Sequence, residues 1–291
     1  MKNILKIVFI AFVIVSSFTQ TTYAGEILVV LSGKDHVILK EGKTVQTGFY
    51  LNELMQPVKR FLDKGHTVTF ATPKGQAPSM DKNSDNAMFF GDMEKKPRKA
   101  KKSLKVHKSL LKKLKLMDKK QSPVISLARV KQIGYDHFDA LYEPGGLAPM
   151  NDLIKDPELG ALLKHFHKEN KTTALVCHGP IALLSTLPNP EQFVSKLEDG
   201  KLAKAQDNWI YAGYKFTVFS NEEEDQSKSW LNGGEMKFYP QTGLSKAGGN
   251  FDGGDAWKSK MVTDRELITG QNPASAMEVA NEILKRLSSK N

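Results

Sequence analysis

The hydrophobic positions of the chain fall into two patterns that alternate along its length. Short continuous apolar runs are typical of strands buried on both faces of a parallel sheet, whereas apolar residues that recur with helical spacing indicate amphipathic helices. The predicted strands cover residues 26–31, 66–71, 138–142, 172–176, 214–219 and 265–269. The predicted helices cover residues 47–62, 156–169 and a final stretch from 272 to about 287. This alternation predicts an α/β fold with a doubly wound, mostly parallel sheet.

The first residues follow a different pattern. A short basic start at residues 1–3 precedes an apolar run at residues 4–18, and small residues lie just before Gly25. This three-part arrangement predicts a secretory signal peptide over residues 1–24. The apolar run is short for a membrane-spanning helix. We therefore expect an exported protein, periplasmic or secreted, whose mature chain begins at about Gly25.

The positive charge of the chain is concentrated in one segment. Residues 94–120 hold 13 Lys and Arg residues against Glu94 and Asp118, whereas the whole chain has a net charge of +10. Five apolar residues in this segment predict a helix that packs on the domain: Leu104, Leu110, Leu111, Leu114 and Met117. The lysines then form either a solvated cover or a contact with an anionic surface such as lipid headgroups. Export and the lack of a recognition motif argue against nucleic acid.

The only cysteine of the chain, Cys177, follows the predicted strand 172–176 and precedes His178. A residue at such a corner projects beyond the carboxyl end of a strand, where ligands bind in doubly wound sheets, and the Gly145-Gly146 turn follows another strand in the same way. The amide end of the next helix favours a thiolate, so we predict a lowered thiol pKa and a nucleophile elbow. The alternative is a buried, inert thiol.

The histidines predict no metal site. His165 and His167 lie two positions apart on a predicted helix and therefore point in different directions. No other stretch has the spacing of a metal-ligand cluster.

Four segments carry a resemblance to a known family. ALYEPGGLAPMNDL, ALVCHGPIALL and LITGQNPASA occur in this order and resemble the DJ-1/PfpI superfamily. TGFYLNELMQPVKRFLDKGHTVTFATPKGQAPSMD resembles its Hsp31-like branch. The resemblance covers nearly all of residues 26–288. It implies a flavodoxin-like three-layer α/β/α sandwich, formed by a single domain over residues 25–291 with a basic insertion at about 94–121.

The resemblance also implies a set of site residues around Cys177. Glu53 matches the glutamate that projects from the first helix to the cysteine, although a solvated helix glutamate is the usual case. The family has an acidic residue at about this position that would orient His178. Glu222, Glu223 and Glu224 are the candidates, and the register of the resemblance favours Glu224. Backbone N–H groups of Gly146 and His178 are the candidates for binding the oxyanion of an attacked carbonyl.

One related class is excluded by the order of the residues. Class I glutamine amidotransferase domains share the fold but use a histidine far downstream of the cysteine, and no histidine follows His178 here. "Glutamine amidotransferase-like" therefore describes the expected fold and not the reaction.

Three functions remain open from the sequence. The Hsp31-like resemblance implies a cofactor-independent glyoxalase III-like lyase, a hydro-lyase that converts methylglyoxal to lactate, or a deglycase, in either case a protein of the stress response. The same resemblance implies a chaperone or holdase, which would need an exposed apolar patch. A thiol peptidase or amidase is the third reading. The expected partner is a small carbonyl substrate, and a homodimer is left open.

Overall fold

The protein forms one central sheet of seven strands, and the computed structural model describes residues 24–201 and 208–289. The strand order across the sheet is β10-β11-β7-β6-β1-β4-β5. All neighbours pair in parallel except β10 and β11, which are antiparallel. From one edge to the other, the strands are Met261–Asp264, Leu267–Gly270, Thr172–Val176, Ala140–Glu143, Glu26–Val30, Thr67–Thr72 and Ile125–Ser126.

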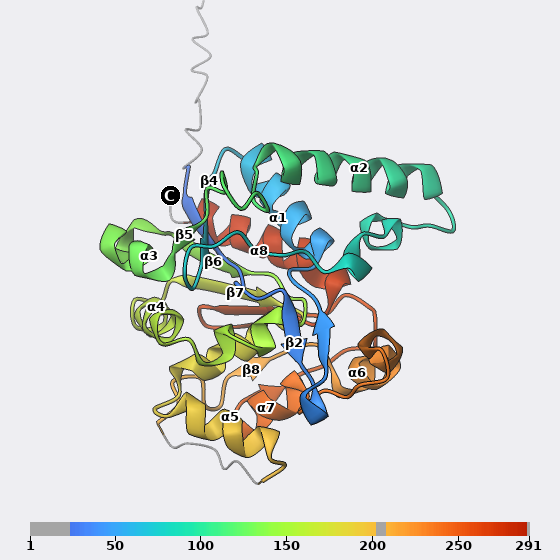
Figure 1. Ribbon diagram of the computed structural model, residues 1–291. Coiled ribbons are helices and arrows are strands. Elements are labelled where there is room, and N and C mark those ends of the chain that lie inside the picture. Colours follow the sequence, from blue (N-terminus) through green and yellow to red (C-terminus); the bar gives the residue numbers. More distant parts are fainter. Residues whose placement is uncertain (1–23, 202–207, 290–291) are drawn as a thin grey trace, which may run out of the picture.

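Helices cover both faces of this sheet, which gives three layers (Figure 1). One face carries α1 (Leu51–Asp63) and α8 (Ala276–Ser288), with α2 (Pro97–Lys113) packed outside α1. The other face carries α3, α4, α5 and α7, which span Leu127–Ile133, Pro157–Lys168, Pro190–Glu198 and Pro240–Ala247. The predicted flavodoxin-like α/β/α sandwich is thereby confirmed.

The central strand β1 shows why the chain folds into layers. Its side chains alternate between two cores: Leu28 and Val30 pack with α4, whereas Ile27 and Val29 pack with α1 and α8. All four side chains are fully buried. A strand buried on both faces needs an unbroken apolar run, and this is the pattern that the sequence shows.

Two smaller sheets lie outside the central one. One pairs β2 (His36–Ile38) with β3 (Thr44–Gln46), and the other pairs β8 (Lys215–Phe216) with β9 (Asn250–Phe251). The prediction of a strand over residues 214–219 in the main sheet was therefore wrong. Only two of these residues are in a strand, and the chain continues through Ser220 into α6 (Asn221–Ser227).

The other boundaries shift by a few residues from their predicted positions. The first helix begins at Leu51 and not at residue 47, because Tyr50 has an extended backbone and is its N-cap. After Cys177 the chain forms the 3₁₀ helix η7 (Gly179–Thr186) and no α-helix. The final helix is preceded by a short 3₁₀ turn at Pro273–Ser275.

The lysine-rich segment forms a helix whose apolar face is shorter than predicted. Leu111 is buried, and Leu104, Leu110 and Leu114 pack partly buried against the core beside α1. Met117, by contrast, is 43% exposed. The helix ends at Lys113, and Lys115 has a φ of 54°, so the helical register is lost before position 117.

The predicted signal peptide lies almost entirely outside the described residues, and it stays a prediction. No helix within the described ranges has both the length and the apolar character that a membrane crossing requires.

Candidate active site

Cys177 occupies a strained corner at the end of β7. Its φ is 60°, in the left-handed region that residues with side chains rarely adopt and that costs about 1–3 kcal/mol. Two backbone hydrogen bonds hold the residue in place: its N–H donates to the carbonyl of Gly270 at 2.8 Å, and its carbonyl accepts from Phe219 at 3.0 Å. The strain is therefore balanced by neighbours on both sides.

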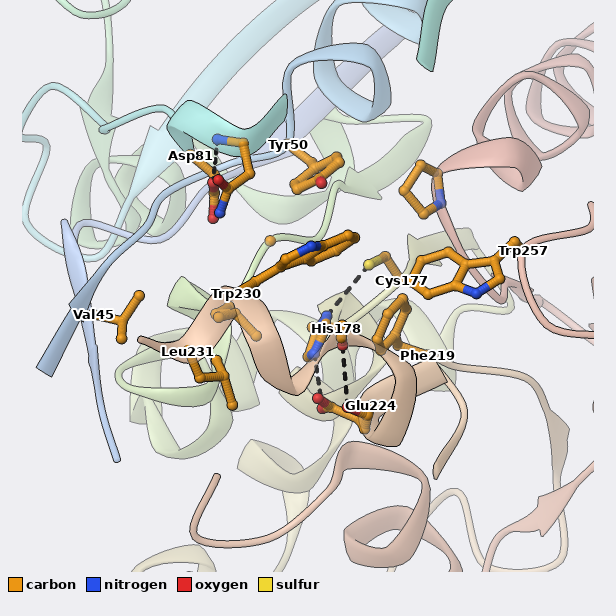
Figure 2. Close-up of a pocket in the computed structure, with 15 residues that line it drawn as sticks. Val45, Tyr50, Asp81, Cys177, His178, Phe219, Glu224, Trp230, Leu231 and Trp257 are labelled. Carbon is orange, nitrogen blue, oxygen red and sulfur yellow. Dashed lines mark hydrogen bonds and ion pairs between the residues drawn. The ribbon is translucent and has the colours of Figure 1, made fainter. Parts of the chain in front are cut away.

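His178 links the thiol to a carboxylate. The Nδ1 atom of His178 lies 3.3 Å from the Sγ atom of Cys177, and Nε2 lies 3.0 Å from Oε1 of Glu224 (Figure 2). All three residues are buried. Glu224 lies on α6, close to position 178 in space although distant in sequence. Of the three consecutive glutamates, Glu224 is the one in contact with His178.

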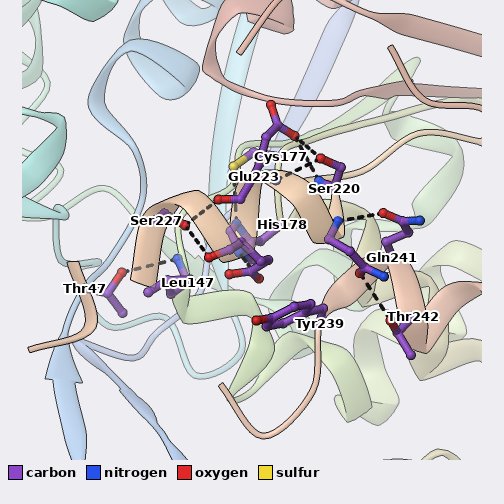
Figure 3. A network of polar contacts seen from close by, with 12 residues as sticks. Thr47, Leu147, Cys177, His178, Ser220, Glu223, Ser227, Tyr239, Gln241 and Thr242 are labelled. Atoms are coloured by element: carbon purple, nitrogen blue, oxygen red, sulfur yellow. Dashed lines mark hydrogen bonds and ion pairs between the residues drawn. The ribbon is translucent and has the colours of Figure 1, made fainter. Parts of the chain in front are cut away.

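The other two glutamates have different surroundings. Glu222 is exposed and accepts a hydrogen bond from Gln226 at 3.0 Å. Glu223 is fully buried and forms a capping box with Ser220 at the start of α6 (Figure 3). The three consecutive glutamates therefore differ: Glu222 is solvated, Glu223 stabilises the start of α6, and Glu224 lies in the site.

Glu223 joins several segments around the site, a role that the sequence did not reveal. Its carboxylate accepts from the Ser220 N–H and hydroxyl, both at 2.9 Å. It also accepts from the Gln271 amide at 3.1 Å, the Asn272 amide at 2.7 Å and the Trp257 N–H at 2.8 Å. Glu223 thus fixes the position of α6, and with it Glu224, relative to β11 and the Trp257 loop. The capping-box pattern Ser220-x-x-Glu223 is the sequence signal that would have found it.

Glu53 reaches the site from the first turn of α1. It is fully buried, and its Oε2 atom accepts a hydrogen bond from the Gly145 N–H at 2.7 Å. No described residue donates a hydrogen bond to its Oε1 atom. Burial raises the pKa of Glu53 from its ordinary value of 4.5 to about 8, although the Gly145 hydrogen bond acts in the opposite direction. The carboxyl group is therefore mostly protonated at neutral pH.

The pKa of the Cys177 thiol is raised, and the prediction of a lowered value was wrong. Burial is the main cause, and the charge of Glu53 adds to it, whereas a hydrogen bond from the Gly146 N–H acts in the opposite direction. The amide that acts on the thiol is that of Gly146, from another loop, whereas the sequence pattern predicted an effect from the amide end of the helix after Cys177. The prediction failed because the loss of solvation in a fully enclosed position outweighs the Gly146 hydrogen bond.

Two loops meet at the site through glycine backbones. Gly146 has a φ of 97°, and a Cβ atom built on it would lie 1.9 Å from the carbonyl oxygen of Gly48. A Cβ atom on Gly145 would lie 2.5 Å from the Cβ atom of Cys177. Only glycine permits this approach. The Gly146 N–H is thereby brought close to the thiol, where an oxyanion would form.

A small pocket opens above Cys177 and His178, and about 40 Å³ of it is accessible to a water-sized sphere. An aromatic series leads from the histidine toward the surface: Phe219 stacks on His178 at 4.6 Å, Trp257 lies 5.5 Å from Phe219, and Trp230 lies 5.6 Å from Trp257. Trp230 and Cys177 line the same pocket (Figure 2). Both tryptophans are partly exposed, at 41% and 36%. These residues come from separate loops, so no local pattern in the sequence indicated them.

Asp81 lines the opposite side of the pocket. Its carboxylate accepts from the Thr47 hydroxyl at 2.7 Å and from the Asn83 N–H at 2.8 Å. Burial raises its pKa from the ordinary value despite these bonds. The sequence reading had not singled out this residue.

The two neighbouring histidines of α4 do point apart. His165 contacts Asp136 at 2.8 Å, whereas His167 contacts Glu266 at 2.8 Å. Within residues 24–201 and 208–289, no three His, Cys, Asp or Glu side chains lie in an arrangement that fits a metal ion.

Comparison with known proteins agrees with the fold and with the quoted segments. The profile of the family described as ThiJ/PfpI family-like matches residues 45–203. The chain belongs to this family. Among curated relatives of this ThiJ/PfpI protein, the protein/nucleic acid deglycase HchA of Staphylococcus aureus is 24% identical over 272 residues, which cover 91% of this chain and 82% of the relative. The predicted membership of the DJ-1/PfpI superfamily, and of its Hsp31-like branch, is thus confirmed.

Solved structures of other proteins show the same fold. Glyoxalase III from Candida albicans is 18% identical with a TM-score of 0.64, covering 90% of this chain and 97% of that one. The Rapid Encystment Protein of 24 kDa from Francisella tularensis is 22% identical with a TM-score of 0.63, covering 90% and 99% of the two chains. The name of the deglycase relatives includes nucleic acid, which runs against our expectation that nucleic acid plays no part.

Proposed function

We propose that the protein is a cysteine-dependent enzyme that acts on small reactive carbonyl compounds and protects against their damage. The reaction that fits the site best is that of a glyoxalase III-like hydro-lyase, in which methylglyoxal and water give lactate. The observation that carries this proposal is Glu53, a buried carboxyl group with a pKa of about 8 beside the Cys177 thiol. Such a group can both donate and accept a proton near neutral pH.

The first step forms a bond between Cys177 and the aldehyde carbon. His178 takes the thiol proton, because its Nδ1 atom lies 3.3 Å from Sγ, and Glu224 stabilises the resulting imidazolium through Nε2. Burial raises the pKa of the thiol, so the attack needs His178 as the base. The carbonyl oxygen receives a proton from Glu53 while the Gly146 N–H stabilises its developing charge. The product is a hemithioacetal.

The second step moves hydrogen between neighbouring carbons. The Glu53 carboxylate removes the proton from the carbon bound to sulfur, and the proton of the hemithioacetal hydroxyl passes to the neighbouring oxygen. The resulting enediolate then receives the proton back from Glu53 on the adjacent carbon. The first carbon is oxidised and the second is reduced, so no external oxidant or reductant is needed. The result is a thioester. Water hydrolyses it to lactate, with its hydroxyl going to the acyl carbon and its proton to Glu53, while the departing thiolate regains its proton from His178.

Deglycation is a second candidate, favoured by the aromatic residues at the rim of the pocket. Trp230 and Trp257 line the pocket and are partly exposed, so the part of a larger substrate that lies outside the pocket would contact them. The HchA relatives, which are named as protein/nucleic acid deglycases, support the same reading. The thiol and Glu53 would act on the carbonyl-derived part of the substrate in the same way.

The test is turnover of methylglyoxal by the purified mature protein, with lactate measured as the product. Cys177→Ala should abolish lactate formation. Activity that persists in this variant would refute the cysteine mechanism, and absence of lactate with the wild type would refute glyoxalase chemistry. Release of free amine from glycated lysine, assayed in parallel, tests deglycation.

We propose further that the protein acts outside the cytoplasm after removal of residues 1–24. The basic, apolar and small-residue regions of this segment support the proposal. Mass spectrometry of protein from an expressing bacterial cell should then give a mature chain beginning at Gly25 in the exported fraction. An intact amino terminus found only in the cytoplasm would contradict it.

A further inference from the structure

Tyr50 lies in the site but takes no part in the chemistry described so far. It is the N-cap residue of α1, only three positions before Glu53, and is 7% exposed. Its N–H donates to the carbonyl of Gly145 at 3.2 Å, and its ring packs edge-on against Phe89 with 5.1 Å between the ring centroids. The first contact holds the backbone of Tyr50, and the second holds its ring.

The hydroxyl group of Tyr50 is buried without a hydrogen-bond partner in the described part of the chain. An unpaired buried hydroxyl is unfavourable and calls for an explanation. Tyr50 lines the same pocket as Cys177 and His178, and Figure 2 shows it across the pocket from His178 and Glu224. A ligand oxygen in the pocket would supply the missing partner.

The hydroxyl acts as a donor at neutral pH. Burial raises the pKa of Tyr50 far above its usual value, and the charge of Asp81 adds to this effect. The residues described around the pocket include Asp81 and Glu224 but neither Lys nor Arg. Tyr50 is therefore a neutral hydrogen-bond donor. Because no described Lys or Arg lines the pocket, the site does not favour a substrate with a carboxylate group and suits an uncharged one.

We propose that the Tyr50 hydroxyl donates a hydrogen bond to the substrate oxygen on the carbon next to the carbonyl that Cys177 attacks. The oxygen of the attacked carbonyl is already served by the Gly146 N–H and by Glu53, so the second oxygen is the one left for Tyr50. The site thereby selects compounds with oxygen on two neighbouring carbons. This inference rests on the proposed function and makes Tyr50 a catalytic residue.

The chain offers a matched control for removal of this hydroxyl. The Tyr211 hydroxyl is also buried without a partner in the described residues, and Tyr211 is 1% exposed. It packs against Trp209 and Tyr214 and does not line the pocket. Tyr50→Phe and Tyr211→Phe therefore each remove one buried, unpaired oxygen, and only the first removes it from the site.

The first measurement is kcat/KM for methylglyoxal. Tyr50→Phe should lower it about 10- to 100-fold, as expected for a donor to a reacting oxygen, and Tyr211→Phe should leave it unchanged. Neither variant should lower the melting temperature, because neither hydroxyl makes a hydrogen bond to a residue within 24–201 or 208–289. A loss of activity that accompanies a loss of stability in Tyr50→Phe would indicate a structural role and overturn the inference.

The second measurement does not depend on turnover. Hydroxyacetone, with oxygens on two neighbouring carbons, and acetone, with one, are compared as protectants of Cys177 against iodoacetamide. In the wild type and in Tyr211→Phe, hydroxyacetone should protect at about tenfold lower concentration than acetone. In Tyr50→Phe this difference should disappear.

The outcomes separate this inference from the proposed function. Selective protection without lactate formation would refute the glyoxalase reaction and leave the role of Tyr50 standing. Lactate formation that is equal in the wild type and Tyr50→Phe would overturn the inference while the proposed function stands. Equal protection by the two ketones in the wild type would also overturn it.

Discussion

The acidic side chains at the carboxyl ends of the strands are buried, whereas the basic side chains of helix α2 are exposed. At the sheet edge, Glu53, Glu223 and Glu224 are all buried, and each makes hydrogen bonds to groups on distant segments. On α2 most lysines are exposed, and Lys108 makes an ion pair with Asp85 at the surface. A buried charge changes pKa values and chemistry, whereas an exposed charge is screened by water. The difference teaches that the number of charges in a segment says little about where the chemistry is.

The largest effect is expected when one buried carboxyl group is replaced by a group that cannot exchange a proton. Glu53→Gln keeps the size of the side chain and its acceptor for the Gly145 N–H, yet it can neither donate nor accept the proton that the reaction moves. We expect turnover of methylglyoxal to fall roughly 10²- to 10⁴-fold. Lactate formation under saturating substrate measures this.

Glu143 provides the matched control for that substitution. It is also a fully buried glutamate, at the end of β6, and burial raises its pKa well above the ordinary value. Glu53 bonds to the Gly145 N–H and acts on Cys177, whereas neither carboxyl oxygen of Glu143 has a hydrogen-bond partner among the described residues, and the charge that acts on it is that of Asp152. Glu143→Gln should therefore retain near-native turnover. Equal losses in the two variants would mean that any buried glutamate at this edge affects activity through the fold.

A second expected effect is on stability and its pH dependence. The pKa of Glu53 rises from 4.5 in the unfolded chain to about 8 in the folded protein, so the folded state holds its proton more tightly. The contribution of Glu53 to stability is therefore complete below pH 4.5 and is lost as pH rises toward 8. The free energy of unfolding of the wild type should fall, relative to Glu53→Gln, by about 1.4 kcal/mol per pH unit in this window.

Urea unfolding at pH 5 and at pH 7 provides the measurement. The gap between Glu53→Gln and the wild type should widen in favour of the variant by about 3 kcal/mol over those two units. A gap that stays constant with pH would show that the Glu53 pKa is not raised in the folded state.

The third expected effect is on the reactivity of the thiol. Since burial and the Glu53 charge both raise the pKa of Cys177, alkylation by iodoacetamide should be slow near neutral pH and should increase only in the alkaline range. Glu53→Gln removes the charge contribution and should move the rate–pH profile to lower pH. Mass spectrometry of Cys177 follows the rate. Rapid alkylation of the wild type well below pH 8 would instead restore the lowered pKa that the sequence predicted.

The smallest effect is expected on α2. Six exposed lysines can be replaced by glutamine while Lys108 is retained: Lys99, Lys101, Lys102, Lys105, Lys112 and Lys113. Turnover should be unchanged, and stability should change by less than about 0.5 kcal/mol per site. Any association with anionic vesicles should be confined to low salt, because the apolar face is occupied by the core and screening weakens the rest. Binding that resists physiological salt in the wild type and is lost in the variant would make α2 a membrane-docking helix.

The same contrast explains how far the sequence could be read. The buried strands, the Cys177 corner and the position of Glu53 were predictable, because each depends on a local pattern or on a quoted segment of the family. The direction in which the pKa of Cys177 shifts was not predictable, because it depends on how completely distant segments exclude water from the thiol. Trp230, Trp257 and Tyr50 line one pocket only because tertiary packing brings their separate segments together. Met117 was misplaced because a helical pattern in the sequence does not show where the helix ends.

The contact between Gly48 and Gly146 has a consequence for recognising this type of site in other chains. The turn can approach the thiol because Gly145 and Gly146 both lack a Cβ atom, which would lie 2.5 Å from the Cβ atom of Cys177 and 1.9 Å from the carbonyl oxygen of Gly48, respectively. This approach involves no side chain that could be sought as a catalytic residue. A homologous chain that keeps the cysteine and histidine but carries alanine at either glycine position would have to separate the two loops. Its Gly146-equivalent N–H would then move away from the sulfur. Presence of both glycines is thus a better criterion for transferring an activity between sequences than presence of the cysteine alone.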